Sequence, residues 1–165
     1  MDITPTIRPV HATDAPRLDQ IRALAFAPIF ASFRAMLGVH LFQLTQANCD
    51  TDQSQYLTSI LLPDSGWEVY VATVDGVVVG FVSLQLNPTT LVGEIGLNAV
   101  HPDWGGHGIG TAMYEFATTR MRAAGMHAAV VSTGGDDSHA PARRAYTKAG
   151  FTVGIPSVWL CQSLD

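Results

Sequence analysis

The stretch V-H-P-D-W-G-G-H-G-I-G-T at residues 100–111 joins the end of a strand to the start of a helix. Pro102 stops the strand, and the glycines that follow let the backbone approach a ligand closely. The first amide N–H groups of the helix have no intrahelical acceptor, and the helix dipole favours negative charge beside them. The segment therefore predicts a binding site for phosphate oxygens. A glycine-rich connection that binds no ligand is the alternative.

The glycine spacing distinguishes this loop from two other phosphate-binding loops. A GxGxxG loop that starts at Gly106 would need a third glycine where the chain has Thr111, and a Walker loop would need a lysine that residues 100–111 lack. The segment instead resembles V-x-P-x-x-(Arg/Gln)-G-x-G-(Ile/Ala)-(Gly/Ala), the pyrophosphate loop of the GNAT family of N-acetyltransferases. The matching residues are Val100, Pro102, Gly106, Gly108, Ile109 and Gly110. Gly105 departs from the pattern, because the family usually has Arg or Gln there.

A second motif, P-A-R-R-A-Y-T-K-A-G-F at residues 141–151, resembles the A-x-x-x-Y-x-x-x-G-F helix of the same family. The resemblance implies that this helix flanks the pantetheine arm of acetyl-CoA and that Tyr146 acts as the acid that protonates the thiolate. Taken alone, a tyrosine in an amphipathic helix also suits core packing. The family often has Asn where this chain has His139. The implied contacts with acetyl-CoA are Asn98, Ala99, Val100, Gly106, His107, Gly108, Ile109, Gly110, Thr111 and Ala142.

A third segment, E-I-G-L-N-A-V at residues 94–100, resembles the strand that carries a glutamate base in histone-type members of the family. Strand alternation places Glu94, Gly96 and Asn98 on one face, and the apolar residues between them on the other. Glycine beside a carboxylate leaves a gap that suits a substrate groove. We therefore expect Glu94 to be the general base; a solvent-facing glutamate, with solvent as the proton acceptor, is the alternative. The resemblance also implies an oxyanion donor among the backbone N–H groups near Asn98 or Ala99.

The order of predicted elements indicates a mixed α/β sandwich in a single domain, residues 1–165. The Asp75-Gly76 dipeptide between two β-branched runs is typical of a hairpin. We expect strands at residues 6–10, 67–74, 77–86, 93–100, 127–133 and 157–164. We expect helices from Thr13, at 52–62, 108–124 and 138–150, with broken helices between 26 and 44 around Pro28 and Gly38. The sheet would be mixed, mainly antiparallel and flanked by helices, as in the GNAT fold.

Composition limits the partners. The formal charge of −5 argues against sequence-independent binding to nucleic acid, which needs a basic surface. Cys49 and Cys161 are isolated, and the histidines lack ligand spacing, so we expect neither disulfides nor a metal.

No uninterrupted apolar run reaches the roughly 18 residues of a membrane span, and no signal peptide is evident, so we expect a cytoplasmic protein. The apolar stretch 26–44 would line a homodimer interface or the acceptor pocket, in a monomer or a homodimer.

The expected reaction is direct attack of a primary amine on acetyl-CoA. The acceptor would be a small cationic amine, such as a polyamine, an amino sugar or aminoglycoside, or an amino acid. Asp136 and Asp137 would hold its positive charge, although charges at a helix N-terminus are an equal alternative for them. Two other functions remain open: acetylation of protein Lys or N-terminal amines, and a non-catalytic module that binds or senses CoA.

Overall fold

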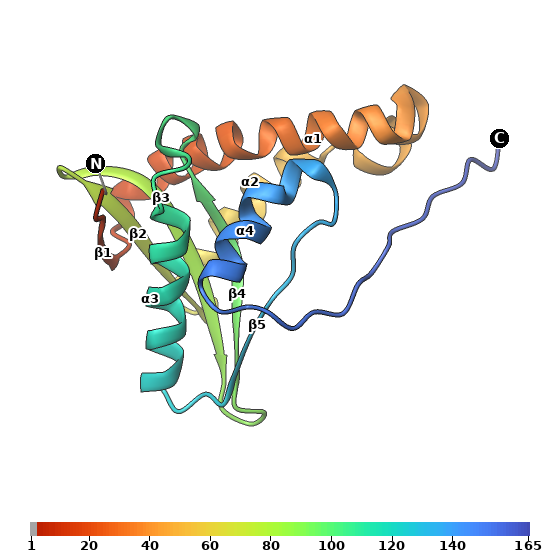
Figure 1. Ribbon diagram of the computed structural model, residues 1–165. Helices are drawn as coiled ribbons and strands as arrows, with labels where there is room; N and C mark the ends of the chain where they lie inside the picture. Colours follow the sequence, from red (N-terminus) through yellow and green to blue (C-terminus); the bar gives the residue numbers. More distant parts are fainter. Residues whose placement is uncertain (1–2) are drawn as a thin grey trace.

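The computed structural model describes residues 3–165, which contain a five-stranded sheet (Figure 1). The strands lie side by side in chain order: β1 (Thr6–Pro9), β2 (Trp67–Val74), β3 (Val77–Asn87), β4 (Val92–Val100) and β5 (Ala128–Val131). The first three pairs are antiparallel, whereas β4 and β5 are parallel. The prediction of a mixed, mainly antiparallel sheet is confirmed.

Helices cover both faces of the sheet. They are α1 (Ala15–Gln46), α2 (Cys49–Ile60), α3 (Ile109–Ala123) and α4 (Ala140–Lys148). In Figure 1, α3 and α4 lie in front of the sheet, and α2 lies behind it. Three short 3-10 turns connect these elements: η1 (Ala12–Asp14), η2 (Pro102–Trp104) and η3 (Asp137–His139). The predicted helices at 52–62, 108–124 and 138–150 are confirmed, with bounds shifted by one to three residues.

The alternating side chains of β3 divide between two cores. Val82 and Leu84 pack beneath α3 and α4, together with Ile109, Met113, Ala117, Met121 and Tyr146. Phe81 points to the opposite face and packs with Leu18 and Ile21 of α1 and with Leu57 and Ile60 of α2. Each helix pair therefore has its own apolar layer, and the sheet separates the two.

The first helix is less broken than its sequence suggests. Gly38 has φ 74° and ψ 165°, so the predicted break is confirmed there. The helix continues through Pro28, however, and the predicted break at that residue is wrong. Proline removes one backbone hydrogen bond and bends a helix, but a long helix tolerates the loss when the turns on both sides continue.

The stretch Ala12–Gln46 is long and apolar enough to cross a membrane by length and composition alone. The expectation that no segment meets this test is therefore wrong. Between Arg22 and Asp50, Arg34 is the one Lys, Arg, Asp or Glu residue of the chain. Small and polar residues interrupt the apolar residues of this helix, so it contains no continuous apolar run long enough to span a membrane although it carries little charge. Core helices of soluble proteins can have the same length and composition.

The edge of the sheet beside β5 differs from the prediction. The strand spans four residues, so it is shorter than the strand expected at 127–133, and Ala128 and Val130 are exposed. The prediction of a strand at 157–164 is wrong, because the residues after α4 from Phe151 onward have no regular structure and extend away from the body (Figure 1). Without that strand, the outer edge of β5 has no strand partner among the described residues.

Candidate functional site

The N-terminus of α3 is open to solvent and free of side-chain caps. Gly106 and Gly108 have φ of 80° and 77°, in the left-handed region that favours glycine, and a Cβ at either residue would meet open space. The first intrahelical hydrogen bond is donated by the Ala112 N–H to the Gly108 carbonyl, at 3.0 Å. The preceding amides of Ile109, Gly110 and Thr111 therefore have no intrahelical acceptor. This geometry suits phosphate oxygens.

The other predicted cofactor contacts lie at the end of β4, in the adjoining loop, in the first turn of α3 and near the start of α4. The side chains of Ala99 and Ile109 are buried in the two cores, so only their backbone atoms are available to a ligand. Val100 is packed against the α3–α4 core, whereas His107 is exposed. Ala142 is half-buried in the first turns of α4. With glycine at position 105, His107 is the loop side chain that remains for a phosphate contact.

Tyr146 belongs to a buried polar cluster between α3, α4 and β4. The Asn98 Nδ2 donates to the Tyr146 hydroxyl at 2.9 Å and to the Gly96 carbonyl at 2.9 Å. The Tyr114 hydroxyl donates to Asn98 Oδ1 at 2.7 Å, and the two tyrosine rings stack with centroids 4.2 Å apart. Asn98 therefore fixes both phenols.

The cluster leaves Tyr146 with a proton to donate. Burial raises the pKa of Tyr146, against the opposing effect of its hydrogen bond with Asn98. Burial also raises the pKa of Tyr114. Both phenols are consequently neutral at pH 7. Because the Tyr146 oxygen accepts from Asn98, its own O–H is available to another acceptor.

A β-bulge in β4 overturns the predicted alternation. The ladder pairs Val82 with Asn98 but Leu84 with Ile95, so β4 has one extra residue in this interval. Ser83 Oγ donates to the Leu97 carbonyl at 2.8 Å and satisfies the backbone there. Glu94 consequently lies on the α1–α2 face and Asn98 on the α3–α4 face, whereas the sequence placed them on one face.

The register confirms these faces. Glu94, Gln85 and Trp67 form one row across β4, β3 and β2. Trp67 packs against the α1–α2 core, so the whole row faces that side. A Cβ at Gly96 would overlap the Trp67 indole. The side-chain-free gap predicted beside Glu94 is therefore filled by that ring, and the interpretation of Gly96 as part of a groove is wrong.

Glu94 is exposed at the mouth of a shallow depression. The depression has a volume of about 130 Å³ and is lined by Gln85, Asn87, Thr90, Val92, Glu94 and Val130. Tyr56 of α2 lies on the same side, and burial and the Glu94 charge raise its pKa. The geometry therefore places a solvent-accessible carboxylate opposite α2.

Strands β4 and β5 separate beyond Ile95. Their parallel ladder ends at Ile95 and Val131, whereas β4 continues to Val100. On its other side, β4 stays paired with β3 through Asn98, Ala99 and Val100. The edge of Asn98 and Ala99 that faces away from β3 has no strand partner among the described residues. A gap of this kind admits an extended ligand arm, and its free N–H groups are suitable oxyanion donors.

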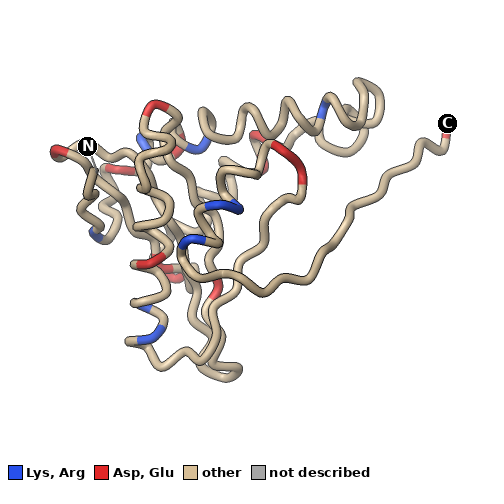
Figure 2. Tube along the Cα trace, viewed as in Figure 1, with Lys and Arg blue, Asp and Glu red and all other residues tan. Residues whose placement is uncertain are grey.

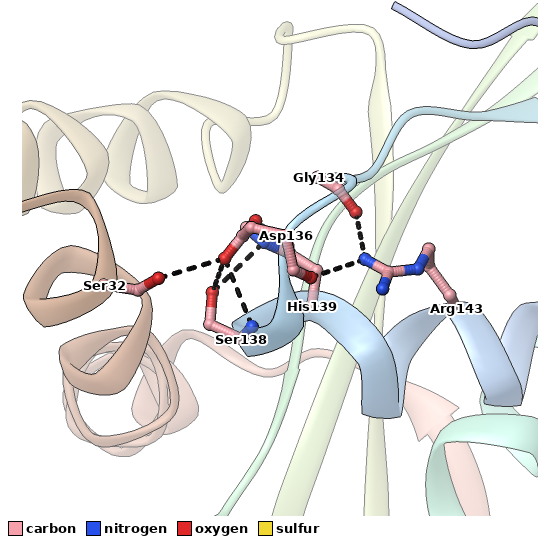
Figure 3. Close-up of polar contacts among 6 residues, drawn as sticks. All are labelled: Ser32, Gly134, Asp136, Ser138, His139 and Arg143. Carbon is pink, nitrogen blue, oxygen red and sulfur yellow. Dashed lines mark hydrogen bonds and ion pairs between the residues drawn. The ribbon is translucent and has the colours of Figure 1, made fainter. Parts of the chain in front are cut away.

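Asp136 is held by several neighbours in the loop before α4 (Figure 3). Its Oδ1 lies 2.6 Å from His139 Nδ1, and its Oδ2 accepts hydrogen bonds from Ser32 of α1 and from the Ser138 backbone, both at 3.2 Å. Burial raises the pKa of Asp136, but the hydrogen bonds from Ser138 and His139 outweigh it and hold the pKa at about 2. The carboxylate therefore links α1 to α4.

Other contacts fix the same loop. Arg143 donates to the carbonyls of Gly134 and Asp136 at 2.6 and 2.7 Å (Figure 3). The His139 ring stacks on Phe33 of α1. Asp137, in contrast, is exposed. Of the two acidic residues proposed to hold a cationic substrate, Asp137 is the one whose side chain faces solvent. The role of either as a substrate contact stays a prediction.

Sequence reasoning missed Tyr114, Trp67 and Ser32. Tyr114 lies four residues after Gly110, on the face of α3 that meets α4, and this helical spacing is a signal that could have identified it. Trp67 and Ser32 reach the site from distant parts of the chain, and no local pattern marks them.

The sequence profile described as the Acetyltransferase (GNAT) family matches residues 36–151. A GNAT-family protein from Desulfovibrio desulfuricans shares the fold with a TM-score of 0.67 at 21% identity, over 92% of this chain and 87% of that one. An aminoglycoside acetyltransferase from an uncultured soil metagenomic sample, solved with sisomicin, has a TM-score of 0.60 at 18% identity, over 98% and 97%. Ribosomal-protein-alanine N-acetyltransferase from Brucella melitensis has a TM-score of 0.57 at 22% identity, over 97% and 100%.

No curated protein sequence matches the chain. The structural likenesses have low sequence identity and establish the fold, whereas the family profile spans most of the chain, from the second half of α1 to the end of the Tyr146 motif. Together with the open glycine turn at α3 and the Tyr146 cluster, that profile decides the identity. The chain belongs to the GNAT family of acetyltransferases.

Proposed function

We propose that this protein moves the acetyl group of acetyl-CoA to a primary amine by direct attack, without a covalent enzyme intermediate. The observation that carries the proposal is the Asn98–Tyr146–Tyr114 cluster, which holds a neutral phenol beside the gap between β4 and β5. Acetyl-CoA is the acetyl donor general to the family. Its pyrophosphate would bind the free amides at the N-terminus of α3, and its pantetheine arm would follow the gap.

On this proposal the two proton transfers occur on opposite faces of the sheet, because the bulge in β4 separates Glu94 from Asn98. An aliphatic amine has a pKa near 10 and must lose a proton before it attacks. Glu94, on the α1–α2 face, would accept that proton directly or through water. The amine nitrogen then bonds to the acetyl carbon, and a backbone N–H near Asn98 or Ala99 stabilises the oxyanion. The C–S bond breaks as the intermediate collapses, and Tyr146, on the α3–α4 face, gives its proton to the CoA thiolate.

We propose a small cationic amine as the acceptor: a polyamine, an amino sugar or aminoglycoside, or an amino acid. The net charge of −5 and the exposed carboxylates of Glu94 and Asp137 favour a cation. Asp136 contributes less to this attraction, because Ser32, Ser138 and His139 already compensate its charge. Among the proteins of similar fold, one acts on aminoglycosides, while another carries the name of a ribosomal-protein acetyltransferase. A protein amine is therefore the second candidate.

An acceptor screen tests the proposal. The protein is incubated with acetyl-CoA and with polyamines, aminoglycosides, amino acids and Lys or N-terminal peptides, and free thiol release is recorded. We expect release with a small amine and none without acceptor. The Tyr146→Phe protein is the matched control, because it keeps the ring packing and loses the acid. Release with peptides alone would favour a protein substrate. Tight CoA binding without transfer to any amine would instead indicate a non-catalytic CoA-binding module.

A further inference from the structure

The residues after Phe151 form an apolar tail that the rest of the chain does not cover. Its large side chains are between 61% and 97% exposed: Val153, Ile155, Val158, Trp159, Leu160 and Leu164. Figure 1 shows the tail leaving the end of α4 and crossing free space toward the distal end of α1, where Asp165 Oδ1 lies 3.1 Å from His40 Nε2. Exposed apolar surface of this extent is typical of a segment that binds another protein surface.

The outer edge of β5 is similarly uncovered. This strand is the last in the sheet, and β4 pairs with its inner side. Natural sheets protect such edges with charges, prolines or bulges. The β5 sequence A-A-V-V has none of these, and residues 149–164 carry no charged side chain (Figure 2). Both the edge and the tail therefore have the properties of strands that are paired.

A hollow beside β5 provides space for the apolar side chains of an added strand. It has a volume of about 250 Å³, and its walls include Met121, Met126, Ala128, Ala129 and Phe151. It lies where the chain leaves α4, next to the start of β5. The hollow shares Ala128 and Ala129 with β5, so it lies directly beside that strand.

The segment between α4 and the tail favours an extended path. Pro156 disfavours helical backbone at Ile155, and after α4 the chain runs away from its own β5 (Figure 1). The tail nevertheless has the β-branched and aromatic character of a strand at residues 157–164. Its natural partner is then the β5 edge of another copy.

We propose that two copies of this chain exchange their C-terminal tails, each adding residues 157–164 as a strand to the outer edge of the other's β5. The exchange covers both exposed edges and both apolar tails at once. It is a closed two-fold arrangement, because each copy gives and receives the same segment. The proposal concerns assembly alone and does not depend on the proposed acetyl transfer.

The first test compares the full chain with a chain that ends at Thr152, by sedimentation equilibrium and amide hydrogen exchange. We expect the full chain to be a dimer with protected amides at residues 157–164, and the shortened chain to be a folded monomer. A full chain that is monomeric overturns the proposal, whether its tail is protected or not. A shortened chain that still dimerises also overturns it.

The second test mixes two defective chains. The Val130→Asp chain has an intact tail and a charged β5 edge, and the chain ending at Thr152 has an intact edge and no tail. Val130 is 46% exposed, so the fold should tolerate the substitution; Ala128→Asp is the second variant if circular dichroism shows that it does not. We expect each chain to be monomeric alone and a one-to-one heterodimer to form on mixing. Absence of the heterodimer would show that the tail does not enter another copy's edge.

The control examines the other exposed apolar surface, on α1. Val39 is 58% exposed, and a Val39→Asp chain should remain a dimer. If Val39→Asp alone produces monomers, the interface lies on α1 and the tail exchange is wrong.

Discussion

The two faces of the sheet differ in how completely the chain covers its own apolar residues. On the α3–α4 face, α3 buries a row of side chains that runs from Ile109 to Met121, and Tyr146 joins it from α4. On the opposite face, burial along α1 ends at Arg22, which bonds Asp19 and Asp50 at 2.7 and 2.8 Å. Further along α1, Met36, Val39 and Leu44 are exposed.

The difference teaches which parts of the function one chain completes alone. On the α3–α4 face, the Asn98–Tyr146–Tyr114 cluster has its hydrogen-bond partners within the chain, and the amides at the N-terminus of α3 are left for a ligand. The α1–α2 face, with the distal half of α1, leaves apolar surface and carboxylates for something that the chain does not supply. We interpret this as the division between a fixed acetyl-CoA site and an acceptor side that substrate or a second copy completes.

The largest effect is expected from filling the open turn before α3, which tests whether this face holds the cofactor. Gly108→Val adds a β-branched side chain where φ is 77°, in the space assigned to phosphate. Losing two charge-assisted hydrogen bonds should weaken CoA binding by about 100-fold or more, measured by calorimetry. Gly135→Val is the matched control, since a Cβ there meets open space without a left-handed backbone. Unchanged CoA affinity in Gly108→Val would remove the pyrophosphate from this turn.

A second substitution tests the chemistry on the same face. Tyr146→Phe should lower kcat by about 10- to 1000-fold and leave CoA affinity nearly unchanged, because the ring packing is retained and the acid is lost. Tyr114→Phe should lower kcat less, because Tyr114 bonds Asn98 and acts through it. Steady-state kinetics on both variants checks the order. Equal effects would mean that the cluster orients groups and that Tyr146 is not the acid.

On the opposite face, Glu94→Gln probes the base. The substitution should depress kcat/KM by about 10- to 100-fold at low pH, where little free amine exists without help. Raising the pH should restore part of the rate, because solvent then deprotonates the acceptor. Glu68→Gln is the matched control, since that carboxylate pairs with Arg120 and lies away from the β4–β5 gap. A Glu94→Gln protein with an unchanged pH profile would leave solvent as the proton acceptor.

The smallest expected effect concerns the contact between α1 and α4. The pKa of Asp136 lies at about 2, below its ordinary value of 3.8, so the fold favours the ionised form. Its contribution to stability is present above about pH 4 and disappears as the pH falls toward 2. Asp136→Asn should lower the free energy of unfolding by about 1 kcal/mol at pH 7, measured by urea denaturation. Asp137→Asn, at an exposed position, should leave it unchanged, and a matching loss there would contradict the assignment.

The sequence predicted those features that depend on neighbouring residues. The hairpin at Asp75-Gly76 has φ of 49° and 78°, as a type I′ turn requires, and the left-handed glycines at 106 and 108 precede α3 as expected. Tyr146 also lies where its motif predicted. In each case the chemistry of a few adjacent residues determines the local backbone.

The features that the sequence could not predict depend on distant residues. The bulge that moves Asn98 to the other face shows only in the pairing of β4 with β3, and Trp67 fills the space at Gly96 from two strands away. Asp136 looked like a substrate contact, yet Ser32, more than a hundred positions earlier, binds it. The tail has a strand's composition, but its position depends on which edge is available to it.

The bulge also bears on the order in which substrates bind. On the proposed mechanism, acetyl-CoA enters along the α3–α4 face, while the amine reaches the same carbonyl past Glu94 on the other. Neither molecule then obstructs the entrance of the other, and free CoA can depart while the acetylated amine is still bound. One extra residue in a strand would thus give the enzyme a ternary complex without a compulsory order of addition, visible as intersecting initial-rate lines and competitive inhibition by each product against the substrate that shares its site.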